Sequence, residues 1–253
     1  MESIRKPFQG VSNIIRFNWH FYVMAIFVIL LCLLFIPFVH ESLRIMLLVL
    51  IALLTIPVLG SLLVSYYVYD VSGLYKLSWI AGKDNQNILH ISAGFDETSA
   101  IIKAKFPAAQ LVNCDFYNAD RHTEISIKRA RLKYPLADGC MAINSTNLPF
   151  EDSSFDLILA IFSVHEIRDQ EERILFFKQL HRVLSDDGTI QVTEHLRDLP
   201  NFLAYQIGFF HFYSLNTWKH TFAEAGFALK SEIKVNPFVS TFDLKKVNHG
   251  NPS

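Results

Sequence analysis

The sequence predicts an α/β domain, with a mostly parallel sheet and an antiparallel edge hairpin, preceded by an apolar helical hairpin. Two long apolar runs without a charged residue occupy 21–39 and 45–68. From residue 87 onward, short apolar runs alternate with segments of helical periodicity, which is typical of a parallel sheet covered by helices. The last two apolar runs, 228–235 and 238–244, lie close together, and this spacing favours an antiparallel pair at one edge.

The two N-terminal apolar runs are each long enough to cross the roughly 30 Å hydrocarbon core of a bilayer as a helix. Only 40–44 connects them, so we expect an antiparallel hairpin with both ends on one side of the membrane. A cleaved signal peptide and a buried soluble hairpin are the alternatives. Against a signal peptide, no small-x-small cleavage pattern follows the first run, and a second run comes at once.

The flanking charges predict the orientation of this hairpin. The positive-inside rule places the N-terminus and the α/β domain in the cytoplasm, as parts of an integral membrane protein in contact with the lipid bilayer. Pairing of hairpins into a homo-oligomer stays open, because no small-x-x-x-small face argues for it. The side of the membrane that holds both ends of the hairpin carries Arg5, Lys6, Arg16, Lys76 and Lys83. The short loop on the other side carries only Arg44. Nearby aromatic residues, among them Tyr69 and Tyr75, either form an interfacial belt or pack against the domain.

The alternating region is expected to contain five strands and four helices, followed by the two strands of the edge hairpin. Strands are expected at 87–91, 110–114, 140–143, 155–162 and 189–193, and helices at 98–106, 124–132, 169–184 and 217–225. The helix from Asp169 begins with a capping pair, because Asp169 and Glu172 have the spacing of a capping box. We therefore divide the chain into an N-terminal segment with two transmembrane helices (1–68), a juxtamembrane linker (69–86) and the α/β domain (87–253).

Composition excludes some partners and chemistries. The chain has 253 residues, a formal net charge of -1 and no basic block, so nucleic acid is not expected as a partner. Its cysteines, Cys32, Cys114 and Cys140, show no paired spacing, which favours a reducing compartment. The zinc-protease pattern H-E-x-x-H fails after His165 and Glu166, and the other histidines are scattered, so no metal is expected.

Three motifs occur in order along the α/β domain. LPFEDSSFD spans 148–156, HRVLSDDGTIQVTE spans 181–194, and Ala-Gly-Phe at 225–227 follows the last helix. In this order they resemble the ubiquinone/menaquinone-type branch of class I S-adenosylmethionine (SAM) dependent methyltransferases, over 87–244. The resemblance implies a Rossmann-like class I methyltransferase domain that uses SAM as its cofactor.

The same resemblance implies that the turn after the first strand binds SAM, with Ser92, Ala93, Gly94 and Asp96 as its residues. The family has three glycines there, as G-x-G-x-G, and only Gly94 remains in this chain. A glycine lets the backbone approach the ligand closely. Asp96 either holds the ammonium group of the methionine moiety or caps the following helix.

Two further polar residues stand where the family contacts the nucleoside. Asp115 ends the second strand at the spacing expected of a carboxylate that accepts hydrogen bonds from ribose hydroxyls. Asn144 follows the third strand, and its amide oxygen is expected to accept a hydrogen bond from the adenine amino group. Tyr117 either stacks near the adenine or packs on the surface.

The fourth strand ends in Ser163, Val164, His165 and Glu166, at the position that faces the cofactor methyl group and the acceptor in this family. Ser163 is expected to line the cofactor site. His165 is the candidate catalytic base because an unperturbed imidazole titrates near neutral pH, and Glu166 either orients it or assists directly. The alternative for His165 is a histidine that hydrogen-bonds only to the backbone.

The segment 199–213 is unusually aromatic, and in the family the region after the fifth strand often covers the acceptor. We expect His195, Tyr205 and His211 to contact the substrate. An apolar cover beside a membrane anchor suggests a hydrophobic small-molecule acceptor, such as a quinone precursor, a polyketide-type lipid or a phospholipid head group. Alternatively, the aromatic side chains complete the domain core or pack on the hairpin.

The sequence thus predicts methyl transfer from SAM to a membrane-resident acceptor at the cytoplasmic face. Two other functional classes stay open. The altered glycine turn would suit a membrane scaffold or binding protein that kept the fold and lost catalysis. An oxidoreductase that uses a nicotinamide nucleotide on a similar sheet is the third class, and the LPFEDSSFD stretch argues against it.

Overall fold

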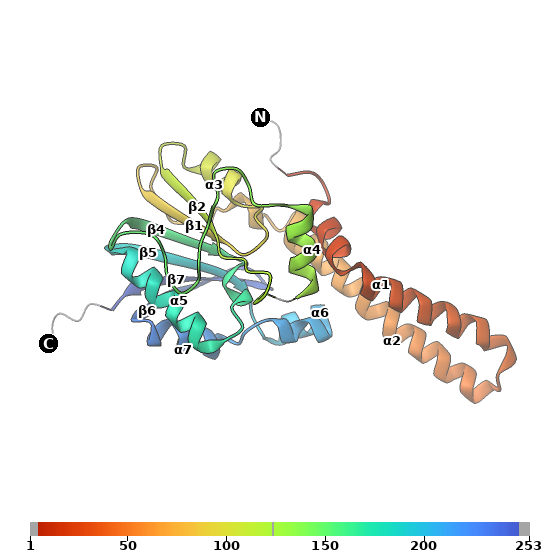
Figure 1. The fold of residues 1–253 in the computed structure, drawn as a ribbon. Coiled ribbons are helices and arrows are strands. Elements are labelled where there is room, and N and C mark those ends of the chain that lie inside the picture. The colour runs from red at the N-terminus through yellow and green to blue at the C-terminus, as the bar shows by residue number, and fades with distance from the viewer. Residues whose placement is uncertain (1–4, 123, 248–253) are drawn as a thin grey trace.

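The structure is a computed structural model that describes residues 5–122 and 124–247, and it consists of an α/β domain from which a long helical hairpin projects (Figure 1). The hairpin is formed by α1 (Gln9–Phe35) and α2 (Glu41–Tyr66), joined through the short helix η1 (Ile36–Phe38). Two helical turns, η2 (Tyr67–Val71) and η3 (Leu74–Lys76), connect it to the domain. Residues 1–4 and 248–253 of the predicted domain ranges lie outside the described residues.

The domain alternates strands and helices as predicted. In chain order its elements are β1 (Asn87–Ser92), α3 (Ser99–Lys105), β2 (Gln110–Asp115), α4 (Ile125–Lys133), β3 (Met141–Ala142), β4 (Phe155–Ile161), η4 (Val164–Glu166), α5 (Gln170–Val183), β5 (Leu184–His195), α6 (Leu199–Tyr205), η5 (Gln206–His211), α7 (Leu215–Glu224), β6 (Phe227–Asn236) and β7 (Val239–Lys246). Asp169 caps α5 as expected, accepting a hydrogen bond from the Glu172 N–H.

The strands form a single sheet in the order β3-β2-β1-β4-β5-β7-β6. The neighbours from β3 to β5 are parallel, and β7 is antiparallel to both β5 and β6. This arrangement confirms the predicted fold class. The chain changes direction across the sheet between β1 and β4, and ligands of such sheets bind at this switch point, beyond the carboxyl ends of the strands.

β5 differs from its prediction, because it begins at Leu184 and contains Gly188. The apolar run predicts only the shorter strand 189–193 here. A Cβ on Gly188 would lie 2.6 Å from Cδ1 of Leu184, so the chain approaches itself closely where glycine alone fits. The pairing register between β4 and β5 shifts in the same region, between Phe155 and Leu157.

Apolar layers cover both faces of the sheet. α5 and α7 pack on one face through side chains such as Phe177 and Trp218. On the other face, Ile102 of α3 shares a core with Leu77 from the segment 69–86. Leu77 is fully buried, so the segment between the hairpin and β1 contributes to the domain core.

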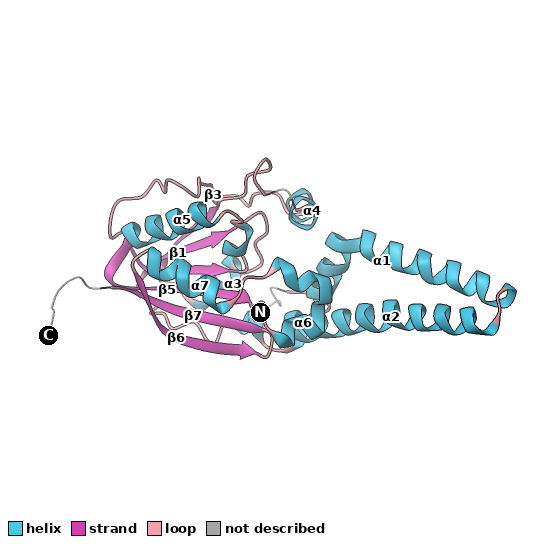
Figure 2. Cartoon of the chain, turned by 90° about the horizontal axis from the view of Figure 1, so that it is seen from below, coloured by secondary structure: helices cyan, strands magenta, loops and turns pink. Residues whose placement is uncertain are grey.

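Both helices of the hairpin are long and apolar enough to cross a membrane, and most of their large apolar side chains are exposed. They run side by side away from the domain and turn at the far end (Figure 2). The described helix α1 starts well before the predicted apolar run, since its first turns pack against the domain. An exposed apolar surface of this extent fits contact with lipid better than contact with water.

The carboxylate of Glu97, just after the β1 turn, binds the base of the hairpin to the domain. It accepts hydrogen bonds from Gln9 Nε2 at 2.9 Å and from Asn13 Nδ2 at 3.1 Å, both on α1. It also accepts one from the Tyr75 hydroxyl at 2.8 Å, and it pairs with Arg5 Nη1 at 2.9 Å. One buried acid therefore joins α1, the η3 turn and the loop that follows β1.

Asp70 of η2 makes a second connection by capping α1. Its carboxylate accepts hydrogen bonds from the N–H groups of Gly10 at 2.8 Å and Val11 at 2.9 Å, which have no partner within the helix. A Cβ on Gly10 would lie 2.3 Å from Cβ of Tyr69, so a glycine is required at this contact. α1 and the end of α2 are thereby fixed together at the domain surface.

Aromatic residues at the hairpin base pack on the domain. The Tyr69 hydroxyl lies 2.7 Å from His195 Nε2 at the end of β5, and Tyr75 donates to Glu97. For these two residues the domain-packing alternative is confirmed.

Replacing Glu97 with alanine should loosen the hairpin from the domain. The change leaves four donor side chains, including the Arg5 cation, without this acceptor, and we expect the free energy of unfolding to fall by about 2–4 kcal/mol. Thermal unfolding of the detergent-solubilised full chain measures the change. Glu151→Ala, at an exposed carboxylate beside β4, is the control and should unfold like the wild type. Equal unfolding temperatures for all three proteins would contradict the role assigned to Glu97.

Candidate active site

The carboxyl ends of β1, β2 and β4 meet at one edge of the sheet and carry many of the predicted site residues. β1 pairs with both neighbours there, through Ser92 with Asp115 and Ile91 with Ala160. In the turn after β1, Gly94 has a φ of 83°, a left-handed conformation that favours glycine. The one glycine that this chain keeps is thus the one that the backbone requires.

Asp115 ties this turn to β2. Its Oδ2 accepts hydrogen bonds from the Gly94 N–H at 3.0 Å and the Ser92 hydroxyl at 3.1 Å, and its Oδ1 accepts from the Tyr117 N–H at 2.8 Å. The residue is 4% exposed, and Oδ2 also pairs with Arg131 Nη2 at 2.5 Å. Because the guanidinium already compensates the carboxylate, a ligand hydroxyl has to take the place of Arg131 to reach Oδ2.

Side chains of α4 and of the loop after β2 cover the turn. A Cβ on Gly94 would lie 2.9 Å from Cδ2 of Tyr117 and 3.0 Å from Cγ1 of Ile127. The Arg131 guanidinium lies 5.1 Å from the centroid of the Tyr117 ring, within the range of a cation–π contact. The turn is therefore closed in this conformation by one aromatic, one aliphatic and one basic side chain.

On its other side, α4 contacts α1 of the hairpin (Figure 1). Arg129 Nη1 donates to the Phe17 carbonyl and lies near His20 Nδ1, each at 2.7 Å. The Tyr134 hydroxyl, just after α4, donates to Asn13 Oδ1 at 3.0 Å. The helix that covers the β1 turn is thus held by the helix that leads into the apolar hairpin.

Two cavities open at this edge of the sheet. The larger has a volume of about 260 Å³, and Gly94, Asp96, Asp115 and Arg131 are among its lining residues. The smaller, of about 130 Å³, is lined in part by Tyr117 and Asn144. Together they follow the carboxyl ends of β1, β2 and β3, where an elongated ligand of this fold would lie.

Two residues predicted to contact the cofactor, Asp96 and Asn144, each have the side-chain Oδ1 atom engaged in hydrogen bonds within the protein. Asp96 Oδ1 accepts hydrogen bonds from the N–H groups of Thr98 at 2.8 Å and Ser99 at 3.0 Å, so the capping alternative describes it. Asn144 Oδ1 accepts from the N–H and the hydroxyl of Thr146, each at 2.9 Å. In this conformation both lone pairs of the Asn144 oxygen close a local turn, and its contact with adenine stays a prediction.

The end of β4 places Ser163 and His165 at the same edge. Ser163 is 1% exposed, and its Oγ has no hydrogen-bond partner among the described residues. His165 Nδ1 lies 2.7 Å from Oε2 of Glu194, the penultimate residue of β5, and its Nε2 lies 3.3 Å from Glu166 Oε1. The imidazole of His165 therefore lies between the carboxylates of Glu194 and Glu166.

These carboxylates change the protonation expected of His165. Burial disfavours the charged ring, but Glu194 and Glu166 outweigh burial and raise the pKa of His165 to about 10. Burial likewise opposes ionisation of Glu166, but His165 and His211 lower the pKa of this carboxyl to about 2. The two carboxylates therefore favour the protonated form of His165, so its pKa does not lie near neutrality, which was the reason for expecting a general base.

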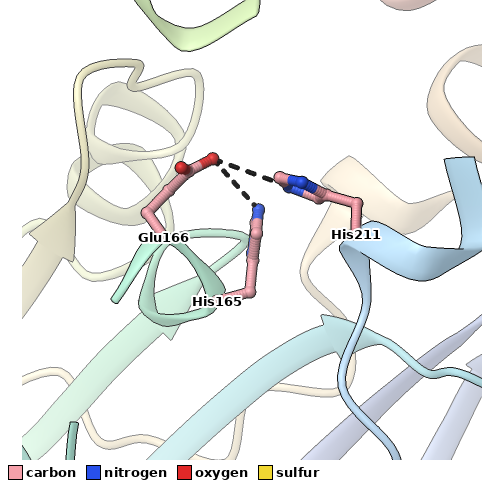
Figure 3. Close-up of side chains that lie close together, drawn as sticks. All are labelled: His165, Glu166 and His211. Atoms are coloured by element: carbon pink, nitrogen blue, oxygen red, sulfur yellow. Dashed lines mark ion pairs between the residues drawn. The ribbon is translucent and has the colours of Figure 1, made fainter. Parts of the chain in front are cut away.

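His211, at the end of η5, completes this cluster, as Figure 3 shows. Its Nε2 lies 3.7 Å from Glu166 Oε1, and its Nδ1 lies 2.8 Å from Glu124 Oε1, just before α4. The rings of His165 and His211 meet edge to face, with centroids 4.9 Å apart. Of the three predicted substrate contacts, His211 is the one that the fold brings to the end of β4.

His195 and Tyr205 lie instead in the packing between the domain and the hairpin. His195 is 4% exposed, and both ring nitrogens are engaged: Nε2 with Tyr69, and Nδ1 with the Phe238 carbonyl at 2.9 Å and Asn201 Oδ1 at 3.0 Å. Burial lowers the pKa of His195 to about 4, so the ring stays neutral. The Tyr205 ring packs against His195 at 5.5 Å. Both ring nitrogens of His195 are thus engaged within the protein, whereas the Tyr205 hydroxyl is buried with no hydrogen-bond partner among the described residues. Neither side chain lies at the end of β4, and their contact with the substrate stays a prediction.

The sequence did not single out Glu194, Glu124 or Arg131. Glu194 stands near the carboxyl end of a predicted strand, so the rule that places strand ends at one edge could have indicated it. Glu124 and Arg131 come from a helix with no motif, and their role follows only from how α4 lies over the sheet.

Comparisons with known proteins agree with this geometry. Residues 89–192 match the family described as "Methyltransferase domain". A demethylmenaquinone methyltransferase of Thermotoga maritima is 29% identical over 134 residues, 53% of this chain and 52% of that protein. The chain therefore spans about half the length of this relative.

Solved structures share the fold. The pyocyanin biosynthetic protein PhzM superposes with a TM-score of 0.53 at 13% identity, covering 74% of this chain and 58% of that one. An O-methyltransferase family 2 protein from Planctomyces limnophilus, in complex with apigenin, gives 0.50 at 15% identity, covering 76% and 62%.

The sheet order, the glycine turn and the matched residues define a class I SAM-dependent methyltransferase domain. This chain carries such a domain, and its residues 89–192 match the methyltransferase family. SAM is the cofactor of the class. The residues fit it in two respects: Gly94 leaves room where a Cβ would collide, and Asp115 stands at the end of β2 beside a cavity.

Substituting alanine for Gly94 should displace α4 as well as strain the turn. A matched control exists in Gly139, which has a φ of 78° but open space where a Cβ would stand. We expect Gly139→Ala to cost about 1 kcal/mol from the left-handed backbone alone, and Gly94→Ala to cost roughly 1–3 kcal/mol more through overpacking. Thermal unfolding of the two variants compares them. Equal losses would show that Tyr117 and Ile127 do not press on the turn.

Proposed function

We propose that this protein transfers a methyl group from SAM to a hydrophobic, membrane-resident acceptor, with the hairpin as a membrane anchor and the domain at the cytoplasmic face. The observation that carries the proposal is the direct bonding of the cofactor turn to the apolar hairpin through Glu97. A site built this way stays next to the bilayer surface, where a soluble acceptor would gain nothing from it. The basic residues at both ends of the hairpin support the cytoplasmic orientation.

The cofactor would lie across the carboxyl ends of β1 to β4. SAM supplies an electrophilic methyl group on a sulfonium. Asp115 is placed to accept hydrogen bonds from ribose hydroxyls once Arg131 withdraws, and Gly94 allows a close approach of the backbone. Tyr117 and Ile127, which cover the turn, have to move at the same time. Cofactor entry is therefore coupled to a shift of α4.

The acceptor would enter on the side of α6 and η5. These helices follow β5 and carry exposed apolar side chains, and α6 lies beside the end of α2 that adjoins the domain. The most exposed are Leu199 at 68%, Leu203 at 66%, Ile207 at 86% and Phe210 at 65%. The surface continues that of the hairpin, which supports an acceptor that arrives from the bilayer. The similarity to a demethylmenaquinone methyltransferase supports a quinone precursor within this class.

The cluster around His165 would act on the acceptor. A protonated His165 cannot take up a proton at neutral pH, but its charge can stabilise an acceptor oxygen that becomes negative. Glu194 holds the ring in place through Nδ1, and Glu166 lies at Nε2. In this proposal His165 is an electrostatic group, and Glu166 and Glu194 position it.

A second function, a membrane scaffold that has lost catalysis, is favoured by one observation. The ion pair between Arg131 and Asp115 occupies the carboxylate on which cofactor binding depends. If Arg131 never withdraws, the domain keeps its fold without binding SAM. The two functions differ in whether the folded protein binds the cofactor.

Calorimetric titration of the detergent-solubilised full chain with SAM separates them. We expect saturable binding, weakened at least about ten-fold by Asp115→Asn, because a charged acceptor of ribose hydroxyls is lost. Asp120→Asn changes an exposed carboxyl on the loop that follows β2 and should bind like the wild type. A folded wild-type protein that binds neither SAM nor its demethylated product would overturn the enzyme proposal and favour the scaffold.

The acceptor class can be tested by incubating the protein with membranes and SAM labelled in its methyl group. Label should move into material that organic solvent extracts, and Asp115→Asn should reduce the yield by at least about ten-fold, in line with its weaker cofactor binding. Label that stays in water-soluble products or in protein, with the cofactor bound normally, would exclude a lipid-soluble acceptor and leave cofactor use intact.

A further inference from the structure

We propose that His165, Glu166 and His211 form a binding site for a divalent transition-metal cation at the acceptor side of the domain. No sequence motif predicts such a site, since these residues lack the spacing of a known metal-binding pattern along the chain. The fold brings them together from two elements, η4 after β4 and the end of η5 (Figure 3). One ligand atom from each residue lies within 4.8 Å of the other two.

The distances fit a common cation. Glu166 Oε1 is 3.3 Å from His165 Nε2 and 3.7 Å from His211 Nε2. Ligand atoms bonded to a tetrahedral zinc ion at about 2.0–2.1 Å stand roughly 3.4 Å apart. Both of these edges are close to this value, and the third edge, between the two histidines, is no longer than 4.8 Å, so His211 on η5 has to move toward His165 to complete the triangle.

Each imidazole is also oriented by a second carboxylate. His165 Nδ1 lies 2.7 Å from Glu194 Oε2, and His211 Nδ1 lies 2.8 Å from Glu124 Oε1. Histidines that bind metals commonly donate their other ring N–H to a carboxylate, which fixes the ring and increases its basicity. Both histidines of the cluster have this partner, and in both the Nε2 atom is the one turned toward Glu166.

Charge balance favours a cation of charge +2. Three carboxylates, Glu124, Glu166 and Glu194, surround the two histidines, and Arg168 is the guanidinium that pairs with Glu124 at 2.9 Å. A metal ion would displace the proton that His165 carries in the metal-free protein, and with both imidazoles neutral, as metal ligands must be, the cluster carries a formal charge of -2. A divalent cation brings it to zero in a partly buried place, where an uncompensated charge is costly.

Arg168 is the group that opposes binding. Its Nη2 contacts His211 Nδ1 and lies 3.0 Å from His211 Nε2, on the ring that would bind the cation. The guanidinium also pairs with Glu124, so it can keep this carboxylate while it leaves the Nε2 atom. The side chain of Arg168 is 35% exposed, and its Nη1 also donates to the His211 carbonyl at 2.6 Å, so an outward movement has to break this hydrogen bond.

The ligand set indicates the kind of metal. Two imidazoles and a carboxylate suit zinc and other transition metals, whereas magnesium and calcium prefer sites made of oxygen alone. Three protein ligands leave a coordination position open for an oxygen from water or from the acceptor. Holding an acceptor oxygen rests on the proposed function, but binding of the cation does not.

The test is metal titration of the chelator-stripped, detergent-solubilised full chain without SAM. We expect one equivalent of Zn²⁺ in competition with a chromophoric chelator, visible absorption from Co²⁺ at the same site, and no comparable binding of Mg²⁺. His211→Gln and Glu166→Gln should each weaken Zn²⁺ binding by at least ten-fold, and Glu124→Gln by about ten-fold through loss of ring orientation. His220→Gln, at an exposed histidine of α7, should leave it unchanged.

Thermal unfolding and SAM titration accompany each variant, so that a folding defect or a failed cofactor proposal is separated from a failed metal site. If one ligand variant does not fold, the other and Glu124→Gln decide the question. The proposal is overturned if the folded wild type binds less than one equivalent of Zn²⁺, or if the cluster variants bind it as the wild type does. If His220→Gln also lost Zn²⁺ binding, the cation would be binding adventitiously at the surface only, and the proposal would be overturned.

Discussion

The buried carboxylate of Glu97 is the contact on which the arrangement of the molecule depends. It stands one residue after the cofactor turn, and its donors come from the segment before α1, from α1 itself and from η3. An acid with 9% of its side chain exposed is stable only when its charge is compensated and its lone pairs are used, and four side chains do this here. The hairpin and the turn therefore form one rigid unit.

The helix α4 extends this coupling across the site. It contacts α1 through Arg129 and covers the turn through Ile127 and Arg131, so the cofactor crevice has one wall that belongs to the hairpin side of the molecule. An ion pair such as Arg131 with Asp115 compensates a buried charge as long as no ligand is present. The same pair makes access to Asp115 depend on where α4 lies.

Polar groups at the end of β4 are organised by charge. Carboxylates from three separate elements surround His165 and His211, and the low exposure of Glu166 and Glu194 makes their compensation necessary. A proton on His165 supplies part of it in this structure. By contrast, His195 lies among aromatic rings, near Phe162, Tyr69 and Phe212, and it stays neutral. The pKa of His165, just after β4, and that of His195, at the end of the neighbouring β5, are therefore shifted in opposite directions, for reasons that neither sequence context reveals.

Patterns in the sequence were enough to predict the helices and strands, and the edge of the sheet where the cofactor would bind. Apolar runs and their spacing are local properties of the chain, so the hairpin, the strands from β1 to β7 and the turn around Gly94 were all predictable, as was Asp115 at a strand end. The contacts that the predicted site residues make could not be predicted from these patterns, because they depend on how the chain packs. His211 joins His165 because η5 folds back over the end of β4, Asn144 turns its oxygen to Thr146, and His195 enters the core because the hairpin base covers it. Such contacts join residues far apart in sequence, and they arise from packing and charge compensation, which no local periodicity encodes.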